Sequence, residues 1–332
     1  RIASSRTAAY TDRQGGPAAA RSSMAPSVNR INPIFTRDLG VSFELIDAPE
    51  LIFTDTATDP FSDPNNPNSL MRENGNYLSD QGKLGEFDIG HVISYRPIGG
   101  GSGVAFLDVA CRDDVNTSNL GLIKGLKATG ATTSSNPSGS TFDIVLLAHE
   151  IGHQLGANHS FNSTQGANCS NGRSGEVAVE PGSGSSIMSY SGLCGSDNLI
   201  NNPRDDYFHF ASITQISNYT RFGSGANCGT NSTGSAPSAN AGADVKIPAN
   251  TPFLLDGTAS GGTSSWDQID IGSASAVDVD TGDNAIIRHN IPSSEQDRYI
   301  PTLADLFAGT TTKGEKLPST SRELNFAYVV RN

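Results

Sequence analysis

Hydrophobic and polar positions along the first part of the chain predict strands followed by a helix. Strand-like runs occur at residues 41–46, 88–95 and 104–110. All three precede residues 142–155, where apolar positions recur with the period of a helix. We therefore expect an α/β or α+β domain in which most strands come before the main helix.

The helix expected over residues 142–155 has Thr141 or Ser140 available as its N-terminal cap. A second helix is predicted from Tyr207 to about Phe222. Its apolar side carries Phe208, Ile213 and Ile216.

A change of pattern near residue 235 predicts a second domain. Residues 229–237 are rich in Gly, Ser, Thr and Asn and have no periodicity, as linkers do. Short alternating runs follow, for example at residues 243–247 and 325–330. They indicate a small β-sandwich of about 95 residues. The predicted domains are residues 1–235 and 236–332.

Composition and charge narrow the class of protein. The chain has 332 residues, 36% of them hydrophobic, and a net charge of −12. No basic surface is visible for a nucleic acid, and no apolar stretch approaches the ~18 residues of a membrane span. The first residues have no apolar run behind them, so we expect that a leader, and with it a propeptide, has been removed.

Four cysteines, at positions 111, 169, 194 and 228, predict an oxidising environment. Their wide spacing contains no CxxC pair, which argues against a structural zinc ribbon. Two disulfides in an extracellular protein fit better. The spacing leaves three connectivities open.

The chemistry is concentrated in residues 148–159. On a helix, His149 and His153 project from one face and can hold one zinc ion. Glu150 lies near the metal without ligating it, where it can take a proton from the attacking water. Gly156 can adopt a positive φ and turn the chain, which brings His159 back as third ligand. Three protein ligands leave one position open, as in catalytic zinc sites.

This pattern is specific. Its five fixed positions would match random sequence about once in a few million windows. Three of the six histidines in the chain fall on it. Residues 186–190, Ser-Ile-Met-Ser-Tyr, follow, with Met188 placed 29 residues after His159. Without the zinc motif, Met188 would be interpreted as a residue that fills space in the hydrophobic core.

Together, the zinc motif and residues 186–190 resemble the active site and Met-turn of the metzincin metallopeptidases. Within that clan, the chain looks like the bacterial secreted reprolysin-like (adamalysin-related) peptidases over roughly residues 10–230. The segments that carry this likeness are residues 29–32, 37–40, 88–92, 180–184, 191–194 and 207–209.

The resemblance implies a twisted mixed sheet with an active-site helix beneath it, then a small lower subdomain that carries the Met-turn. It also implies a secreted zinc endopeptidase, for which we favour a monomer. A protein or peptide substrate would add an extended strand to the sheet edge, here residues 103–109. Cys111 should pair with Cys228, and Cys169 with Cys194.

Residues after 237 resemble the PKD-like or immunoglobulin-like modules of such enzymes. Residues 240–244 and 265–268 are the best points of this likeness. Residues 326–332 look like a final strand cut off at its end, so we expect the natural protein to continue.

Two interpretations of Tyr190 stay open. In astacin- and serralysin-like metzincins a tyrosine at this position reaches the zinc and stabilises the tetrahedral intermediate. The same role is possible here through a hydrogen bond to the developing oxyanion. Alternatively, Tyr190 packs near the floor of the site.

Other features receive structural interpretations. Asp55, Asp59 and Asp63 could bind calcium but match no loop pattern, so we favour a solvated surface loop. Residues 99–103 are glycine-rich, without the lysine of a phosphate loop, and predict a flexible approach to the edge strand. His91 and His209 fit no ligand spacing.

Two other functions compete with the peptidase. The chain could be a surface adhesin that keeps zinc for stability, although a structural site does not need Glu150. The zinc could also hydrolyse something other than a peptide, which a closed pocket would favour over an extended cleft.

Overall fold

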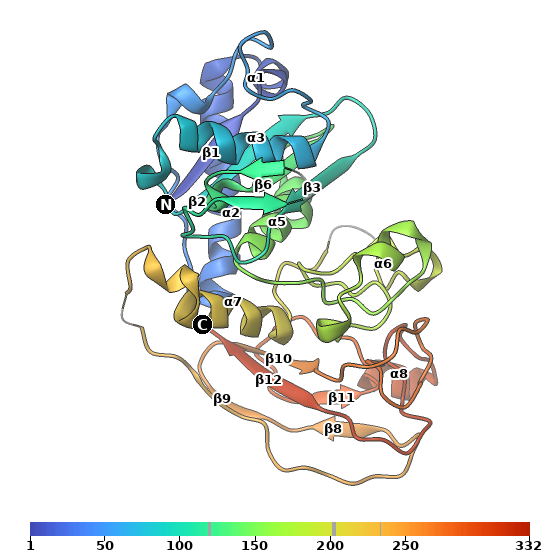
Figure 1. Ribbon diagram of the computed structural model, residues 1–332. Coiled ribbons are helices and arrows are strands. Elements are labelled where there is room, and N and C mark those ends of the chain that lie inside the picture. Colours follow the sequence, from blue (N-terminus) through green and yellow to red (C-terminus); the bar gives the residue numbers. More distant parts are fainter. Residues whose placement is uncertain (119–120, 201–203, 233) are drawn as a thin grey trace. The chain divides into compact units, whose positions relative to one another are not determined.

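The computed structural model describes residues 1–118, 121–200, 204–232 and 234–332 (Figure 1). Their contacts form two compact units that do not follow chain order. The first unit comprises Arg1–Ala157 and Gln215–Asn231, and the second comprises Asn158–Thr214 and Ser232–Asn332. The division of the sequence into domains at residue 235 stays a prediction.

A four-stranded mixed sheet organises the first unit. Its order is β1-β2-β6-β3, with β1, β2 and β6 parallel and β3 antiparallel to β6. The strands are β1 (Ile2–Arg6), β2 (Ile89–Tyr95), β3 (Gly101–Ala105) and β6 (Gly130–Ser134), and a separate pair consists of β4 (Asn116–Ser118) and β5 (Gly121–Ile123).

Helices of this unit begin and end at residues with specific local chemistry. The Thr7 side chain caps α1 by accepting a hydrogen bond from the Tyr10 amide. Helix α2 has proline at its first turn and ends at Gly40 in a left-handed conformation. The helices are α1 (Ala8–Gln14), α2 (Pro17–Leu39), α3 (Pro67–Asp80), α4 (Ser140–Phe142), α5 (Ala148–Gln154) and α7 (Phe210–Phe222), of which α7 begins in the second unit.

Helices cover both faces of the sheet. Val92 of β2 packs with Leu70 and Met71 of α3. The preceding residue, His91, instead contacts Gln154 of α5. Because neighbouring side chains of a strand point to opposite faces, α3 and α5 lie on opposite sides of the sheet (Figure 1). Helix α5, which carries the predicted zinc motif, is thus buried against the face away from α3.

The strand predictions were right in kind but not always in position. Strand β2 matches the predicted residues 88–95, whereas residues 41–46 form no strand and contribute only an isolated bridge at Leu45. The third run is shifted, because β3 spans Gly101–Ala105 rather than residues 104–110. Gly101 and Gly103, predicted as part of a flexible approach, belong to the strand itself. The π-helical turn at Asp143–Leu147 leaves no room for a side chain on Gly101. A Cβ on Gly101 would lie 2.3 Å from Leu146 Cδ1.

The second unit contains short elements. Its apolar core groups Ile286, Ile287 and Ile300. The strands pair in twos as β10–β12, β8–β11 and β7–β9, so the predicted all-β sandwich stays a prediction. The elements are α6 (Gly166–Gly172), α8 (Leu303–Ala308), β7 (Ser238–Asn240), β8 (Phe253–Leu255), β9 (Thr258–Ser260), β10 (Thr263–Gln268), β11 (Arg298–Ile300) and β12 (Phe326–Arg331).

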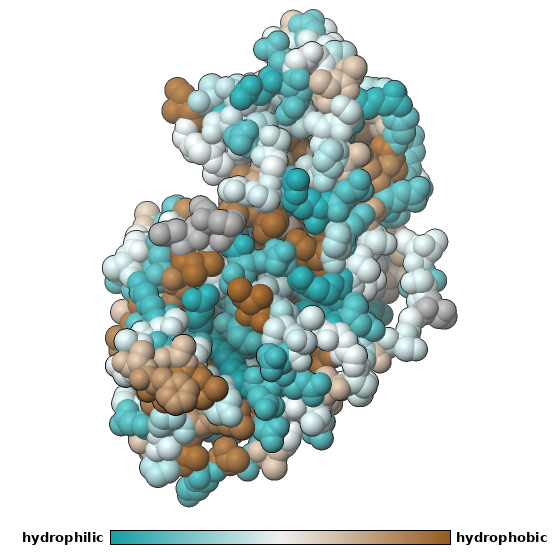
Figure 2. Space-filling view, turned by 180° about the vertical axis from the view of Figure 1, so that it is seen from behind, coloured by the Kyte–Doolittle hydropathy of each residue, from teal (hydrophilic) through white to brown (hydrophobic). Residues whose placement is uncertain are grey.

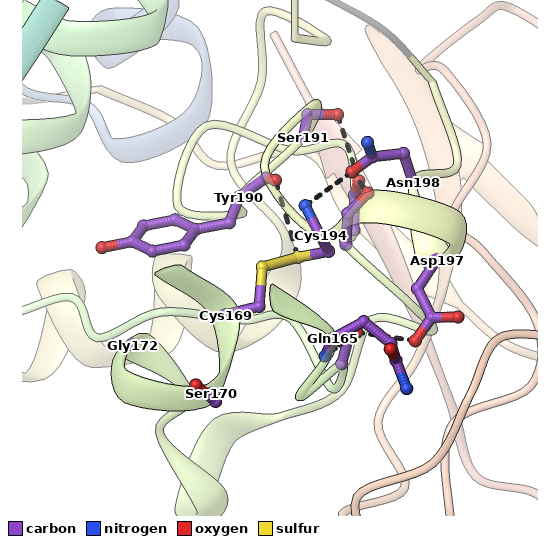
Figure 3. The surroundings of a disulfide bond; sticks show 12 residues. Gln165, Cys169, Ser170, Gly172, Tyr190, Ser191, Cys194, Asp197 and Asn198 are labelled. Carbon is purple, nitrogen blue, oxygen red and sulfur yellow. Dashed lines mark hydrogen bonds between the residues drawn. A yellow bond between two sulfur atoms is a disulfide. The ribbon is translucent and has the colours of Figure 1, made fainter. Parts of the chain in front are cut away.

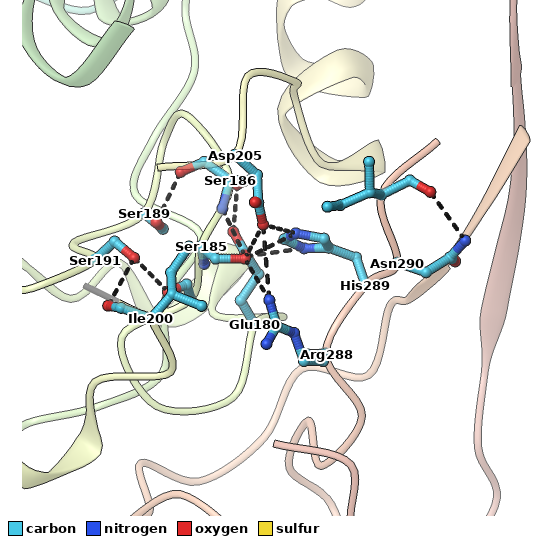
Figure 4. Close-up of polar contacts among 12 residues, drawn as sticks. Glu180, Ser185, Ser186, Ser189, Ser191, Ile200, Asp205, Arg288, His289 and Asn290 are labelled. Atoms are coloured by element: carbon cyan, nitrogen blue, oxygen red, sulfur yellow. Dashed lines mark hydrogen bonds and ion pairs between the residues drawn. The ribbon is translucent and has the colours of Figure 1, made fainter. Parts of the chain in front are cut away.

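A buried polar cluster joins the two stretches of chain that form this unit (Figure 4). The His289 ring lies between two carboxylates, with Nδ1 3.1 Å from Glu180 Oε2 and Nε2 3.3 Å from Asp205 Oδ2. Glu180 also accepts hydrogen bonds from the Ser185 and Ser186 amides at 2.9 and 3.2 Å. Residues after 232 therefore pack directly on the segment that precedes Met188.

Candidate metal centre

Three predicted site residues lie on one helical run. Helix α4, a π-helical turn at Asp143–Leu147 and α5 follow one another without a break, close to the predicted residues 142–155. The run begins after Gly139 with no side-chain cap, so the predicted cap at Thr141 or Ser140 was wrong. The α5 turns carry His149, Glu150 and His153, all buried.

The π-helical turn is tied to α2. Asp143, at its start, is buried and forms an ion pair with Arg30. π-Helical turns inside α-helices are often found at functional sites. This ion pair fixes the turn that leads directly into His149.

The rings of His149 and His153 lie side by side and meet edge to face. Their Nε2 atoms are 3.1 Å apart. His153 Nδ1 is 2.6 Å from the Ala157 carbonyl oxygen, which can only accept, so this nitrogen carries the proton. In the neutral ring, Nε2 of His153 then presents a lone pair. Two ligands at zinc–nitrogen distance in tetrahedral geometry would be about 3.3 Å apart, so this spacing fits a shared ion.

His159 has the same tautomer. Its Nδ1 donates to the Gly172 carbonyl at 2.6 Å, which leaves Nε2 for a metal. Burial lowers the pKa of His159 to about 4, so its ring is neutral at pH 7. One ligand atom from each of His149, His153 and His159 lies within 4.8 Å of the others, and all three are nitrogen donors that suit zinc.

Gly156 makes the turn after the helix, as predicted. Helix α5 ends at Gln154, and Gly156 has φ +101°. A Cβ at this position would lie 2.3 Å from Asp108 Oδ1. Both the conformation and the close approach require glycine.

Glu150 lies against the edge strand. A Cβ on Gly103 of β3 would be 2.4 Å from Glu150 Oε1 and 2.5 Å from its Cγ. The Glu150 side chain is buried, with 5% of the residue exposed. Gly103 thus provides the space that this carboxylate occupies, a positioning role that a period-based interpretation of the sequence could not reveal.

Gln154 anchors the helix to the sheet. His91 Nδ1 lies 3.0 Å from Gln154 Oε1, and Gln154 donates to the Gly90 carbonyl at 2.9 Å. The other ring nitrogen of His91 lies 2.8 Å from Thr132 Oγ1. His91 is therefore structural, as expected. Gln154 is inside the zinc motif, but at a position the motif leaves free, so it gave no signal.

The predicted Met-turn is buried and linked to the third histidine. Met188 is fully buried, and its carbonyl accepts a hydrogen bond from the Ser160 amide at 3.2 Å. The ring of Tyr190 lies 4.4 Å from the His159 ring and 4.6 Å from that of Phe161, on which it stacks. Tyr190 thus packs beside a predicted zinc ligand.

Both disulfides implied by the family resemblance are present. Cys111 pairs with Cys228, and Cys169 with Cys194. Figure 3 shows the second bond, next to Tyr190, with the Cys194 amide donating to Asn198 Oδ1 at 2.8 Å. This bond joins α6, the helix whose Gly172 carbonyl orients His159, to the segment after Met188.

In the described part of the chain, the three histidines are the one group of His, Cys, Asp or Glu arranged to hold a metal. Among the acidic residues considered for calcium, Asp55 accepts a hydrogen bond from the Ala57 amide, and Asp59 accepts hydrogen bonds from the Ala8 and Phe61 amides.

The described helices include none that is long and apolar enough to cross a membrane. On the face shown in Figure 2, hydrophobic residues form separate spots among hydrophilic ones.

Comparison with known proteins bears on the same residues. The family described as metallo-peptidase family M12B, reprolysin-like, matches residues 1–220. No match was found among curated proteins. The matched region includes strands β1–β6, helix α5, the three histidines and Met188. The chain therefore belongs to the reprolysin-like M12B metallopeptidases and is a zinc metalloendopeptidase.

Proposed function

We propose that this protein is secreted and hydrolyses internal peptide bonds of proteins with Glu150 as general base. The observation that carries the proposal is the buried Glu150 carboxylate, next in sequence to His149 and against the edge strand β3. Two disulfides support an oxidising, extracellular location.

His149, His153 and His159 would hold the zinc through their Nε2 atoms. When bound, zinc acts as a Lewis acid on the scissile carbonyl and makes water acidic enough to be deprotonated near neutral pH. Glu150 takes the proton of the attacking water and delivers it to the leaving amine. Burial of the carboxylate favours this transfer, because little bulk water competes for the proton.

Strand β3 supports an extended binding mode for the substrate. It is the last strand in the sheet order, beyond β6. A peptide that adds to such an edge places its backbone, rather than particular side chains, in register with Glu150. A protein substrate with an unfolded or extended segment fits this arrangement.

Unfolded casein is the test substrate. We expect the purified protein to cut it at internal bonds, to lose this activity with its zinc on treatment with a chelator, and to regain it when zinc is returned. Mass spectrometry of the fragments distinguishes internal from terminal cleavage. Hydrolysis that persists in metal-free protein, or none at full zinc occupancy, would contradict the proposal.

Gly103→Ala should impair the reaction without removing the metal. The added methyl group would overlap Glu150 Oε1 and displace the carboxylate. A displacement of about 1 Å typically costs about 10²-fold in rate. We expect a fall of that order in kcat/KM for casein-derived peptides, with unchanged zinc content by atomic absorption. Gly85→Ala is the matched control, because no atom lies within 4 Å of the added Cβ.

Tyr190 is proposed to donate a hydrogen bond to the developing oxyanion, a role that its position beside His159 supports. Tyr190→Phe removes the hydroxyl and keeps the stacked ring. We expect kcat to fall about 10²-fold with zinc content unchanged. Tyr299→Phe, at an exposed ring, controls for the substitution. An unchanged kcat would leave Tyr190 with its packing role alone.

We also propose that residues 236–332 form the accessory β-module that the sequence resembles. The antiparallel pairs β10–β12 and β8–β11 support this proposal. Limited proteolysis should leave residues 236–332 as a protected fragment, and their degradation would contradict the proposal.

A further inference from the structure

One edge of the sheet in the first unit has an irregular cover. Parallel bridges pair Ile2 with Leu45 and Arg6 with Ile52. Strand β1 thus advances four residues between the bridges, while the covering segment advances seven. The extra length cannot stay in register with β1, so residues 46–51 bulge away from it.

A cavity of about 150 Å³ lies at this bulge. Its volume is well below that of ordinary cofactor or drug sites, which measure about 300–1,000 Å³. An apolar cavity of about the same size is known to hold a benzene ring, so a ligand of about six non-hydrogen atoms fits. The lining residues are Arg6, Arg21, Leu45, Ile46, Asp47, Ala48 and Ile52.

Arg6 is the unusual member of this lining. Only 4% of it is exposed, and its Nε has no hydrogen-bond partner. Within the described ranges, no ion pair or side-chain hydrogen bond involves its guanidinium. Burial lowers the pKa of Arg6 to about 10, which still leaves it charged at pH 7. A buried, uncompensated charge is costly and rare in folded proteins.

The other charged groups of the cavity do not neutralise Arg6. Arg21 and Asp47 pair with each other, with Arg21 Nε 2.9 Å from Asp47 Oδ1. The neighbouring Tyr10 is a neutral phenol at pH 7, because burial raises its pKa. The lining therefore carries a net charge of about +1, which a single negative charge would offset.

Size, charge and wall chemistry together define the ligand. A guanidinium forms strong paired hydrogen bonds with a carboxylate. Four of the seven lining residues are Leu45, Ile46, Ala48 and Ile52, which favour an aliphatic group over a fully hydrated inorganic anion. We propose that this cavity binds a carboxylate that bears a short aliphatic group, with Arg6 as its partner. Free branched acids and the carboxyl terminus of a peptide that ends in an aliphatic residue share this chemistry.

Isobutyrate is the probe, and its neutral analogue isobutyramide is the matched control ligand. We expect isobutyrate to raise the Tm of the intact protein by a few degrees and to give saturable heat in calorimetry. Isobutyramide, chloride and sulfate at equal ionic strength should do neither. Because unfolding and heat are measured rather than hydrolysis, the result does not depend on the proposed peptidase mechanism.

Two variants locate the site. Arg6→Met removes the unpaired charge and keeps the length of the side chain, so its Tm without ligand should be equal to or higher than that of the wild type. It should show no response to isobutyrate. Arg221→Met, at an exposed arginine outside the cavity, is the matched control and should keep the response.

An equal response of Arg6→Met, an equal effect of isobutyramide or sulfate, or no response of the wild type would each overturn the proposal. Tighter binding of acetyl-glycyl-valine than of isobutyrate would support the carboxylate site and identify peptide carboxyl termini as its source. Tighter binding of isobutyrate would support it and identify free acids.

Discussion

Glu150→Gln is expected to lower kcat/KM for casein-derived peptides about 10²- to 10⁴-fold while the protein keeps its zinc. Glutamine preserves the shape of the buried side chain against Gly103, but its amide cannot take a proton from water. The three histidines are unchanged, so metal binding should be unaffected. Steady-state kinetics and zinc analysis of the same samples check both statements.

Two further variants make this result specific. Glu86→Gln changes a carboxylate that is 52% exposed, and it should leave kcat/KM and the zinc content unchanged. His153→Ala removes a proposed ligand and should lose zinc and activity together. If Glu150→Gln retained wild-type kcat/KM, Glu150 could not be the general base, whatever the metal content.

Loss of His289 is expected to destabilise the protein by about 3–5 kcal/mol, because it leaves the carboxylate of Glu180 buried without its cation. Both side chains are essentially inaccessible, at 0% and 1% exposure. His289→Ala should therefore lower the free energy of unfolding in urea far more than His209→Ala, whose ring is also buried. In a double-mutant cycle with Glu180→Gln, a coupling energy near zero would contradict an ion pair.

The pH dependence of this pair follows from its two pKa shifts. Burial alone would raise the pKa of Glu180, but His289 and hydrogen bonds lower it below its ordinary value of 4.5. Burial alone would lower the pKa of His289, but Glu180 and Asp205 raise it above 6.5. The contribution of Glu180 to the free energy of unfolding is lost as pH falls through its lowered pKa. The contribution of His289 is lost as pH rises through its raised pKa.

The stability difference between wild type and His289→Ala should therefore be greatest at about pH 4.5–6.5 and decline above it. The His289 ring also contacts the Ser185 hydroxyl and the rings of Tyr207 and His209, and Asp205 carries a further ion pair with Arg288. Urea unfolding at a series of pH values measures this difference. A difference that stayed constant into the alkaline range would indicate that His289 is neutral in the folded protein.

The sequence by itself determined the chemistry that depends on local spacing. His149 and His153 lie side by side because four residues make about one helical turn, and Gly156 turns the chain because it has no Cβ. The helix over residues 142–155 and strand β2 could be predicted for the same reason, since their periodicity lies within a few residues. The disulfide pairs followed from family resemblance, because spacing alone left three choices.

Only the tertiary structure decided which distant residues share a site. Gly103 falls within the edge strand that the resemblance implied, but its close contact with the Glu150 side chain arises only in the folded protein. The pairing of His289 with Glu180 and the isolation of Arg6 are invisible in the sequence. The charge and the interactions of these groups depend on their burial and on their neighbours. Both arise only when segments far apart in the chain pack together and exclude water.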